Sequence, residues 1–167
     1  MNMQINITEM DGAPGREIPF SFSVPAEELD VQSDAYTFDS PIRVEGRVTH
    51  TGTALRVEGT IAATKHFVCD RCLKACEETQ EHPFSEEFRS ENPEEESNVI
   101  IDGRIDLRPL VRDTLMAAQP LSNLCKPDCK GLCPVCGHDL NDGDCGCDRF
   151  VPDPRLAALQ QFMKKED

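Results

Sequence analysis

The sequence predicts an α+β fold, with a mostly antiparallel β-sheet or partial barrel in the N-terminal half. Three observations support this class. Alternating apolar runs fill the first 68 residues, one apolar helical stripe follows near residue 110, and six of the nine cysteines lie between residues 125 and 147. The chain would therefore contain a sheet, one packed helix, a Cys-rich zinc-binding loop module and a C-terminal helix.

The N-terminal strands are predicted from apolar residues at every second position. Such alternation occurs in MQINI at residues 3–7 and in IPFSFSV at residues 18–24. VEGRV at residues 44–48 and VEGTI at residues 57–61 flank a connection that contains Gly52, which favours a hairpin.

A glycine interrupts each arm of this expected hairpin. Gly46 and Gly59 indicate either bulges or a close approach of two backbones. After the second arm, the strand HFVC leads directly into the cysteine pair of CDRC at residues 69–72.

The following stretch is strongly acidic. Residues 77–97 contain nine glutamates and one basic residue, Arg89. Phe84 and Phe88 are compatible with a strand in the first part, whereas SENPEEES is typical of a solvated loop. The stretch is either an exposed surface segment or an acidic patch that docks a basic partner.

A helix is expected over residues 107–118. Asp106 suits the N-cap, Pro109 fits the first turn, and Gln119-Pro120 would end the helix. The apolar residues that share one face are Leu107, Leu110, Val111, Leu115 and Ala118. They would pack this helix against a core.

A second helix is expected at the C-terminus. Asp153 would cap it, Pro154 would take its first position, and Leu156 and Leu159 would begin its apolar stripe. The chain would then divide into a β-rich domain at residues 1–122 and a Cys-rich zinc module with this helix at residues 123–167, together forming one structural unit.

Composition excludes several classes of protein. The N-terminus has no secretion signal, and no run of apolar residues could span a membrane, so a cytoplasmic protein is expected. Disulfide frameworks are rare in that compartment, and nine cysteines cannot all pair within one chain. The net charge of −14 argues against a protein that grips nucleic-acid phosphates and favours a basic protein partner.

Cysteine spacing points to metal instead. CPVCG at residues 133–137 is typical of a zinc knuckle, in which two thiolates bind one ion and the glycine supplies a positive φ. Either Cys125 and Cys129 or Cys145 and Cys147 could complete its tetrahedron. His138, which follows the knuckle, could also replace a thiolate.

One or two zinc ions are therefore expected. Eight cysteines are enough for two four-thiolate sites, and the candidate ligands are Cys69, Cys72, Cys125, Cys129, Cys133, Cys136, Cys145 and Cys147. Cys76 is left over and is interpreted as a small, half-buried hydrophobic residue.

The expected zinc is structural and the protein is expected not to be an enzyme. An all-thiolate site leaves no open position for a reactive water. Neither CxxC pair opens a convincing helix, which argues against a thioredoxin-like role. The sequence also lacks a P-loop and the GxGxxG, GxSxG and HExxH motifs, so no small-molecule substrate is expected.

Several motifs in one order resemble a known family. CDRC, IDLRPLVRDTLMAAQP, CKGLCPVCGHDLN, CGC and DPRLAAL are similar to those of YceD-type large ribosomal RNA subunit accumulation proteins. The resemblance covers about residues 40–160. It implies a role in the accumulation or processing of large-subunit (23S) ribosomal RNA, and it carries over no catalytic residue.

The resemblance and the acidic charge together suggest contact with the pre-ribosomal large subunit through a basic ribosomal protein. Direct contact with ribosomal RNA is the alternative, and the local cations that could make it are Lys126, Lys130, Arg149 and Arg155. A different class of function is a redox-switched zinc-thiolate protein, such as a holdase chaperone, in which oxidation ejects zinc.

Overall fold

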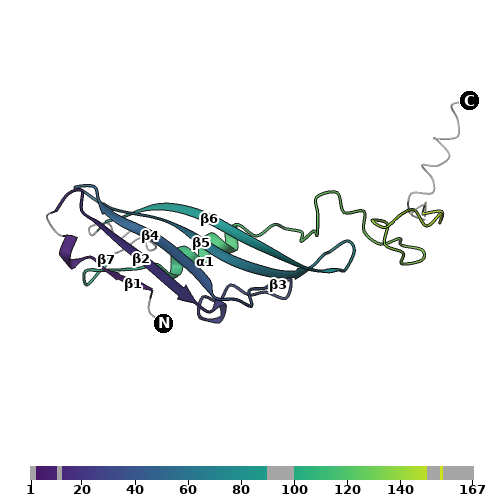
Figure 1. The fold of residues 1–167 in the computed structure, drawn as a ribbon, viewed down its shortest axis with the longest axis horizontal. Coiled ribbons are helices and arrows are strands. Elements are labelled where there is room, and N and C mark those ends of the chain that lie inside the picture. Colours follow the sequence, from purple (N-terminus) through teal and green to yellow (C-terminus); the bar gives the residue numbers. More distant parts are fainter. Residues whose placement is uncertain (1–2, 11–12, 90–99, 150–154, 156–167) are drawn as a thin grey trace, which may run out of the picture.

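A curled antiparallel sheet and one helix form the body of the protein (Figure 1). The thiol-rich part of the chain, residues 123–149, extends beyond one end of this body. The structure is a computed structural model of the 167-residue chain. It describes residues 3–10, 13–89, 100–149 and 155. The predicted α+β class and the curled antiparallel sheet are confirmed.

The larger sheet has five strands. They are β2 (Glu17–Val24), β3 (Tyr36–Thr37), β4 (Ile42–His50), β5 (Leu55–Val68) and β6 (Ala75–Phe88). Strand β4 lies between β2 and β5, β6 pairs with the other side of β5, and the short β3 also pairs with β5. The hairpin predicted around Gly52 is therefore present, and β6 takes up the first part of the acidic stretch.

A smaller sheet contains β1 (Gln4–Asn6), β8 (Arg104–Asp106) and β7 (Ile100–Ile101) in that order. Asp102 and Gly103, both with positive φ, form the turn between β7 and β8. The Asp-Gly pair is a strong hairpin signal, so this hairpin was readable from the sequence although it was not predicted. Two 3₁₀ turns, η1 (Thr8–Met10) and η2 (Ala26–Glu28), complete the N-terminal half.

Helix α1 (Arg108–Ala117) begins one residue later than predicted. Leu107 is its N-cap residue, and the Oδ1 of Asp106 instead accepts a hydrogen bond of 3.0 Å from the backbone N–H of Arg108. The predicted cap was wrong by one position because Asp106 ends β8. Ala118 is the C-cap and is exposed, so it is not part of the buried stripe.

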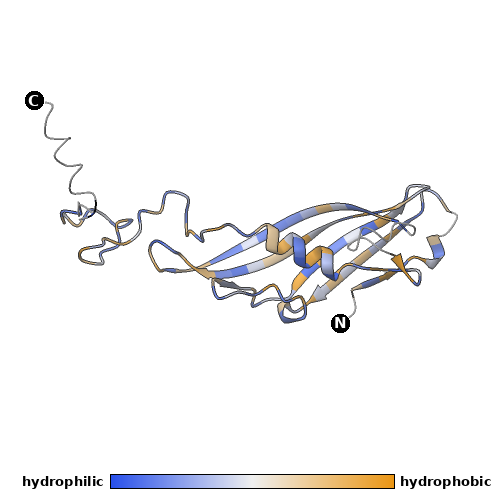
Figure 2. Ribbon diagram, turned by 180° about the vertical axis from the view of Figure 1, so that it is seen from behind, coloured by the Kyte–Doolittle hydropathy of each residue, from blue (hydrophilic) through white to orange (hydrophobic). Residues whose placement is uncertain are grey.

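The hydrophobic core lies between the sheets and α1. Every second residue along most of β4 and β5 faces it, as Val44 and Ile61 do, and α1 contributes Val111 and Leu115. Figure 2 shows hydrophobic and hydrophilic stretches alternating along α1, as expected of a helix that buries one side.

The two glycines inside the hairpin face each other without a bulge. Gly46 pairs with Gly59 in an unbroken register, and their outer neighbours in the same row are Phe20 and Phe84. A Cβ on Gly46 would lie 2.7 Å from the Cα of Gly59 and from the Phe20 ring. A Cβ on Gly59 would lie 2.5 Å from the backbone oxygen of Glu45 and 2.9 Å from the Phe84 ring. Of the two predicted explanations, close approach is therefore the correct one.

The predicted C-terminal helix and the SENPEEES segment lie outside the described residues. In the part of the chain that the structure describes, no helix is long and apolar enough to cross a membrane. After α1, the described chain continues as turns and loops that carry six cysteines.

Candidate metal centres

Eight cysteines gather into two groups of four. The first group, centre 1, contains Cys69, Cys72, Cys125 and Cys129; the second, centre 2, contains Cys133, Cys136, Cys145 and Cys147. Within each group, all sulfur atoms lie within 4.8 Å of one another. These are the eight predicted ligands. The structure also decides a question that spacing left open, because Cys145 and Cys147 join the CPVC pair.

Neither His138 nor Cys76 belongs to these groups. His138 is exposed, and Cys76 is half-buried at the start of β6. The small-hydrophobe interpretation of Cys76 agrees with this burial.

Each centre begins with the same backbone turn. In the first knuckle, residues 69–74, the N–H of Leu73 donates to Cys69 O at 2.9 Å, and the N–H of Cys69 donates to Lys74 O at 2.9 Å. In the second knuckle, residues 133–138, the N–H of Gly137 donates to Cys133 O at 2.9 Å. The N–H of Cys133 donates to the oxygen of residue 138 at 2.8 Å. Two different sequences thus adopt one turn that aims paired thiols to one side.

The residue after each second cysteine has a positive φ. Gly137 has φ 75°, as predicted, and Leu73 has φ 58° at the equivalent position. A left-handed conformation costs a non-glycine residue about 1–2 kcal/mol. Leu73 also exposes 65% of its surface, so burial of its side chain offsets little of that cost. The first knuckle therefore retains its turn at an energetic cost that the second avoids.

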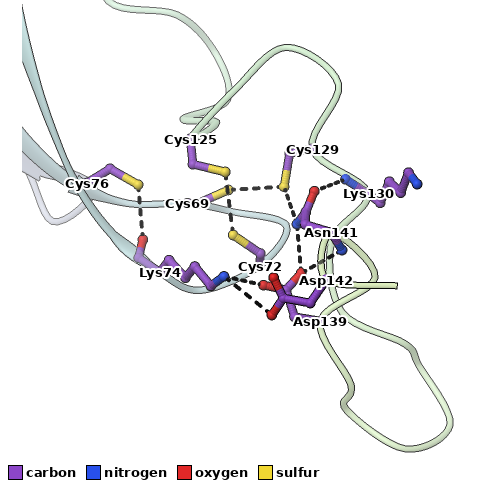
Figure 3. A network of polar contacts seen from close by, with 10 residues as sticks. All are labelled: Cys69, Cys72, Lys74, Cys76, Cys125, Cys129, Lys130, Asp139, Asn141 and Asp142. Carbon is purple, nitrogen blue, oxygen red and sulfur yellow. Dashed lines mark hydrogen bonds and ion pairs between the residues drawn. The ribbon is translucent and has the colours of Figure 1, made fainter. Parts of the chain in front are cut away.

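The sulfur spacing fits a tetrahedral metal and excludes disulfides. Cys69 Sγ lies 3.8 Å from Cys129 Sγ, and Cys72 Sγ lies 3.6 Å from Cys125 Sγ (Figure 3). A tetrahedral ion with metal–sulfur bonds of about 2.3 Å separates its sulfurs by about 3.8 Å, whereas a disulfide needs about 2.05 Å. All nine cysteines are free thiols.

The thiols of centre 1 differ in their readiness to ionise. Burial opposes ionisation of Cys69, yet hydrogen bonds from three backbone N–H groups lower its pKa to about 6. The amide of Asn141 lowers the pKa of Cys129. Desolvation and the neighbouring thiols raise the pKa of Cys125 to about 12. Low pKa values thus favour the thiolate form of some sulfurs, while desolvation and repulsion from the neighbouring thiols raise the pKa of others.

Centre 2 has the same arrangement. The backbone N–H groups of Cys136 and Val135 lower the pKa of Cys133 to about 6, and the neighbouring thiols of Cys136 and Cys145 raise that of Cys147 to about 12. A divalent cation among four thiols removes this repulsion and favours the thiolate form of all four. The donor set is therefore suited to a thiophilic divalent metal.

Centre 1 joins the tip of the β5–β6 hairpin to a segment that is distant in sequence. Asp70 Oδ2 accepts a hydrogen bond of 2.7 Å from the backbone N–H of Asn123, and the N–H of Asp70 donates to Asn123 O at 2.8 Å. Arg71 Nη1 donates to Cys129 O at 2.8 Å. These bonds bring residues 123–129 onto the first knuckle, so the second cysteine pair meets the first.

A buried lysine supports this junction. Lys65, on β5, is fully buried, and its Nζ donates to Asn123 Oδ1 at 2.6 Å. The same Nζ lies 4.9 Å from the ring centroid of Tyr36 and 5.1 Å from that of Phe67. Burial lowers the pKa of Lys65, while the charges of Glu78 and Asp70 oppose the change.

Sequence reasoning missed Lys65 and Asn123. One signal for Lys65 was available, because it continues the inward-facing alternation of Ile61 and Ala63. A lysine at such a position needs a partner in the protein interior. Nothing in the sequence identified that partner as Asn123, 58 residues away.

Three of the four cations proposed as contact residues, Lys126, Lys130 and Arg149, lie in the thiol-rich part of the chain, and Arg155 follows it in the sequence. Lys126, Lys130 and Arg155 are exposed, and Arg149 pairs with Asp144 at 3.4 Å. Residues 123–149 contain three basic and five acidic residues, a net charge of −2. Each four-thiolate metal would add about −2 more, so the region around these cations is acidic.

Comparison with known proteins gives relatives from Mycobacterium tuberculosis and Bacillus subtilis. Uncharacterized protein Rv2926c of Mycobacterium tuberculosis is 29% identical, over 98% of this chain and 83% of its own. Uncharacterized protein YlbN of Bacillus subtilis is 25% identical, over 99% of both chains.

A plant relative has a descriptive name. Large ribosomal RNA subunit accumulation protein YCED homolog 1, chloroplastic, of Arabidopsis thaliana is 24% identical, over 78% of this chain and 52% of its own. No solved structure matches. The family model described as Large ribosomal RNA subunit accumulation protein YceD matches residues 57–163, a range that includes both centres. The chain belongs to the YceD family.

Proposed function

We propose that this protein is a non-enzymatic ribosome-biogenesis factor that supports the accumulation or processing of large-subunit (23S) ribosomal RNA. The observation that carries the proposal is the family match over residues 57–163, together with the name of the Arabidopsis relative. The matched range contains most of β5, all of β6 and α1, and all eight clustered cysteines. The proposal thus rests on the part of the chain in which both candidate centres lie.

The metal in this proposal is zinc, and its role is structural. Four thiolates satisfy the tetrahedral preference of zinc and leave no position for a reacting water. The hydrogen bonds that connect centre 1 to β5 and to residues 123–129 support a cross-linking role. Binding energy at such a site is folding energy.

The proposed partner on the pre-ribosomal large subunit is a basic ribosomal protein. The chain carries a net charge of −14, and two four-thiolate centres would make it more negative by about 4. An acidic surface repels RNA phosphates and attracts Lys- and Arg-rich proteins. Lys126 and Lys130 remain candidates for contact with this partner or with ribosomal RNA.

The proposal is tested by depleting the protein in its own host and measuring the ratio of large- to small-subunit ribosomal RNA. A selective fall in the large-subunit RNA is expected, with recovery when the wild-type chain is supplied again. A chain with Cys69→Ser and Cys72→Ser should fail to restore the ratio, whereas Cys76→Ser, outside both centres, should restore it. An unchanged ratio after depletion would contradict the proposed function.

A redox-switched holdase is the second candidate. It is favoured by one observation: each centre has an exposed cysteine, Cys125 in centre 1 and Cys136 in centre 2, which an oxidant could reach. Mild peroxide should then release zinc rapidly and produce activity that prevents a model protein from aggregating. Thiols that resist peroxide, or zinc release without holdase activity, would contradict this second function.

A further inference from the structure

Two side chains from the loop of centre 2 reach centre 1 (Figure 3). Asn141, which lies between Cys136 and Cys145 in the sequence, donates from Nδ2 to Cys129 Sγ at 3.4 Å. Asp139, in the same loop, forms an ion pair of 2.6 Å with Nζ of Lys74, two residues after Cys72. A ligand of centre 1 and its neighbour Lys74 are thus in contact with the loop whose two ends centre 2 would hold.

The amide of Asn141 is held in a fixed orientation. Its Oδ1 accepts a hydrogen bond of 3.0 Å from the backbone N–H of Lys130, and its Nδ2 also donates to Asp139 Oδ1 at 2.7 Å. The backbone N–H of Asn141 donates to the same Asp139 oxygen at 2.9 Å. These bonds direct the amide N–H group, and not its oxygen, at the sulfur of Cys129.

Backbone contacts add to this connection. The N–H of Leu132 donates to Arg71 O at 3.0 Å, inside the first knuckle. Gly131 lies so close to Arg71 that an added Cβ would be 2.9 Å from its carbonyl oxygen. The N–H of Leu140 donates to Gly131 O at 2.9 Å, which ties the Asp139–Asn141 segment to the same place.

We propose that the two centres are thermodynamically coupled, with metal at centre 2 strengthening metal binding at centre 1 through Asn141 and Asp139. The inference rests on the metal binding in the proposed function, and it is independent of the ribosomal role. A hydrogen bond to a metal-bound thiolate stabilises its charge and fixes its direction. By linkage, metal at centre 1 strengthens binding at centre 2 by the same factor.

The coupling follows from where Asn141 lies in the chain. Cys133 and Cys136 precede it and Cys145 and Cys147 follow it, so metal at centre 2 closes the loop that carries Asn141. Without that closure, ordering the loop against centre 1 costs conformational entropy. Loss of a hydrogen-bond partner of a metal ligand typically lowers metal affinity by about 10- to 100-fold. The coupling factor is expected to be about 10-fold or more.

The test titrates the full-length reduced chain with Zn²⁺ against a chromophoric chelator of known affinity. Signals are assigned to each centre by ¹¹³Cd NMR of the Cys69→Ser/Cys72→Ser and Cys133→Ser/Cys136→Ser variants. Asn141→Ala should lower the zinc affinity of centre 1 by about 10-fold or more. Asn141→Asp, which keeps the size of the side chain and removes its donor, should do the same. His138→Ala is the matched control, because the His138 side chain is exposed and the residue supplies only its backbone oxygen to the second knuckle, which the substitution keeps.

The decisive comparison is a double-mutant cycle. Cys133→Ser/Cys136→Ser should lower the affinity of centre 1 by about the same factor as Asn141→Ala, and combining the changes should add little. Centre 1 affinities within about twofold of wild type in these variants would overturn the coupling. If the wild-type chain binds two zinc ions with independent affinities, the coupling is wrong and the metal assignment stands. A wild-type chain that binds no zinc would overturn the metal assignment as well.

Discussion

The two centres use one turn in two different structural roles. In centre 1 the knuckle is the tip of the β5–β6 hairpin, and its partner cysteines lie more than 50 residues away, at Cys125 and Cys129. In centre 2 all four cysteines fall within residues 133–147. The comparison shows how one local motif can either fasten distant parts of a fold or close a short loop. Only the first role fastens the sheet directly, so it should contribute more to the stability of the sheet.

The largest difference should appear when each centre is removed. Treated as a cross-link over a loop of about 50 residues, centre 1 contributes about 4 kcal/mol through loop-closure entropy alone. With zinc in excess, Cys69→Ser/Cys72→Ser should lower the free energy of unfolding of the sheet by that order. Cys133→Ser/Cys136→Ser should lower it by less, about 1–2 kcal/mol, because its own loop opens and centre 1 loses only about 10-fold in zinc affinity.

Urea unfolding followed by far-UV circular dichroism measures both variants. Each should also release about one equivalent of zinc. Equal losses of sheet stability would contradict the distinction between the two centres, as would a larger loss from the centre 2 variant.

A smaller effect should come from the junction beneath centre 1. Asn123→Ala leaves the buried Nζ of Lys65 without its hydrogen bond of 2.6 Å, which should cost about 1–3 kcal/mol. Leu121→Ala is a suitable control, because Leu121 is a fully exposed neighbour and its substitution should stay within about 0.5 kcal/mol. Chemical denaturation of the zinc-loaded chains measures both, and similar losses would argue against a supporting role for Asn123.

Substituting the positive-φ residue of each knuckle, Leu73 or Gly137, should change the free energy of unfolding by a smaller amount still. The change should have opposite signs in the two centres. Leu73→Asn should stabilise the protein by about 0.5–1 kcal/mol, since Asn tolerates the left-handed φ. Gly137→Leu should destabilise centre 2 by about 1–2 kcal/mol, which is roughly a 10-fold loss of zinc affinity. Thermal unfolding and zinc competition measure these effects. If Leu73→Asn lowers the stability, the Leu73 side chain stabilises the folded chain by more than its left-handed φ costs.

The smallest effect concerns the dependence of stability on pH. Burial lowers the pKa of Lys65 below 10.5, so between the folded pKa and 10.5 the unfolded chain binds more protons than the folded one. The stability of the wild type should therefore rise with pH in this window relative to Lys65→Met. Parallel pH profiles of the two zinc-loaded chains would contradict burial of a titrating lysine.

The sequence identified strands β2, β4 and β5 and the eight cysteines that cluster, but not which strands and cysteines lie together. Alternation in IPFSFSV and the spacing of CPVC depend on neighbouring residues, and local rules predict such features well. The pairing of Cys69 with Cys129 depends on how β5, β6 and residues 123–129 pack, which no local pattern encodes. The contact of Asn141 with Cys129 is likewise a result of tertiary structure.

Metal content distinguishes most sharply between two zinc centres and two clusters of unligated thiols. The chain, purified under reducing conditions, should contain two equivalents of zinc, and Co²⁺ substitution should give the absorption of tetrahedral thiolate sites at both centres. Each double serine variant should lose one equivalent in excess zinc. A metal-free chain that keeps its sheet at full stability, with the eight clustered thiols freely alkylated, would contradict the account.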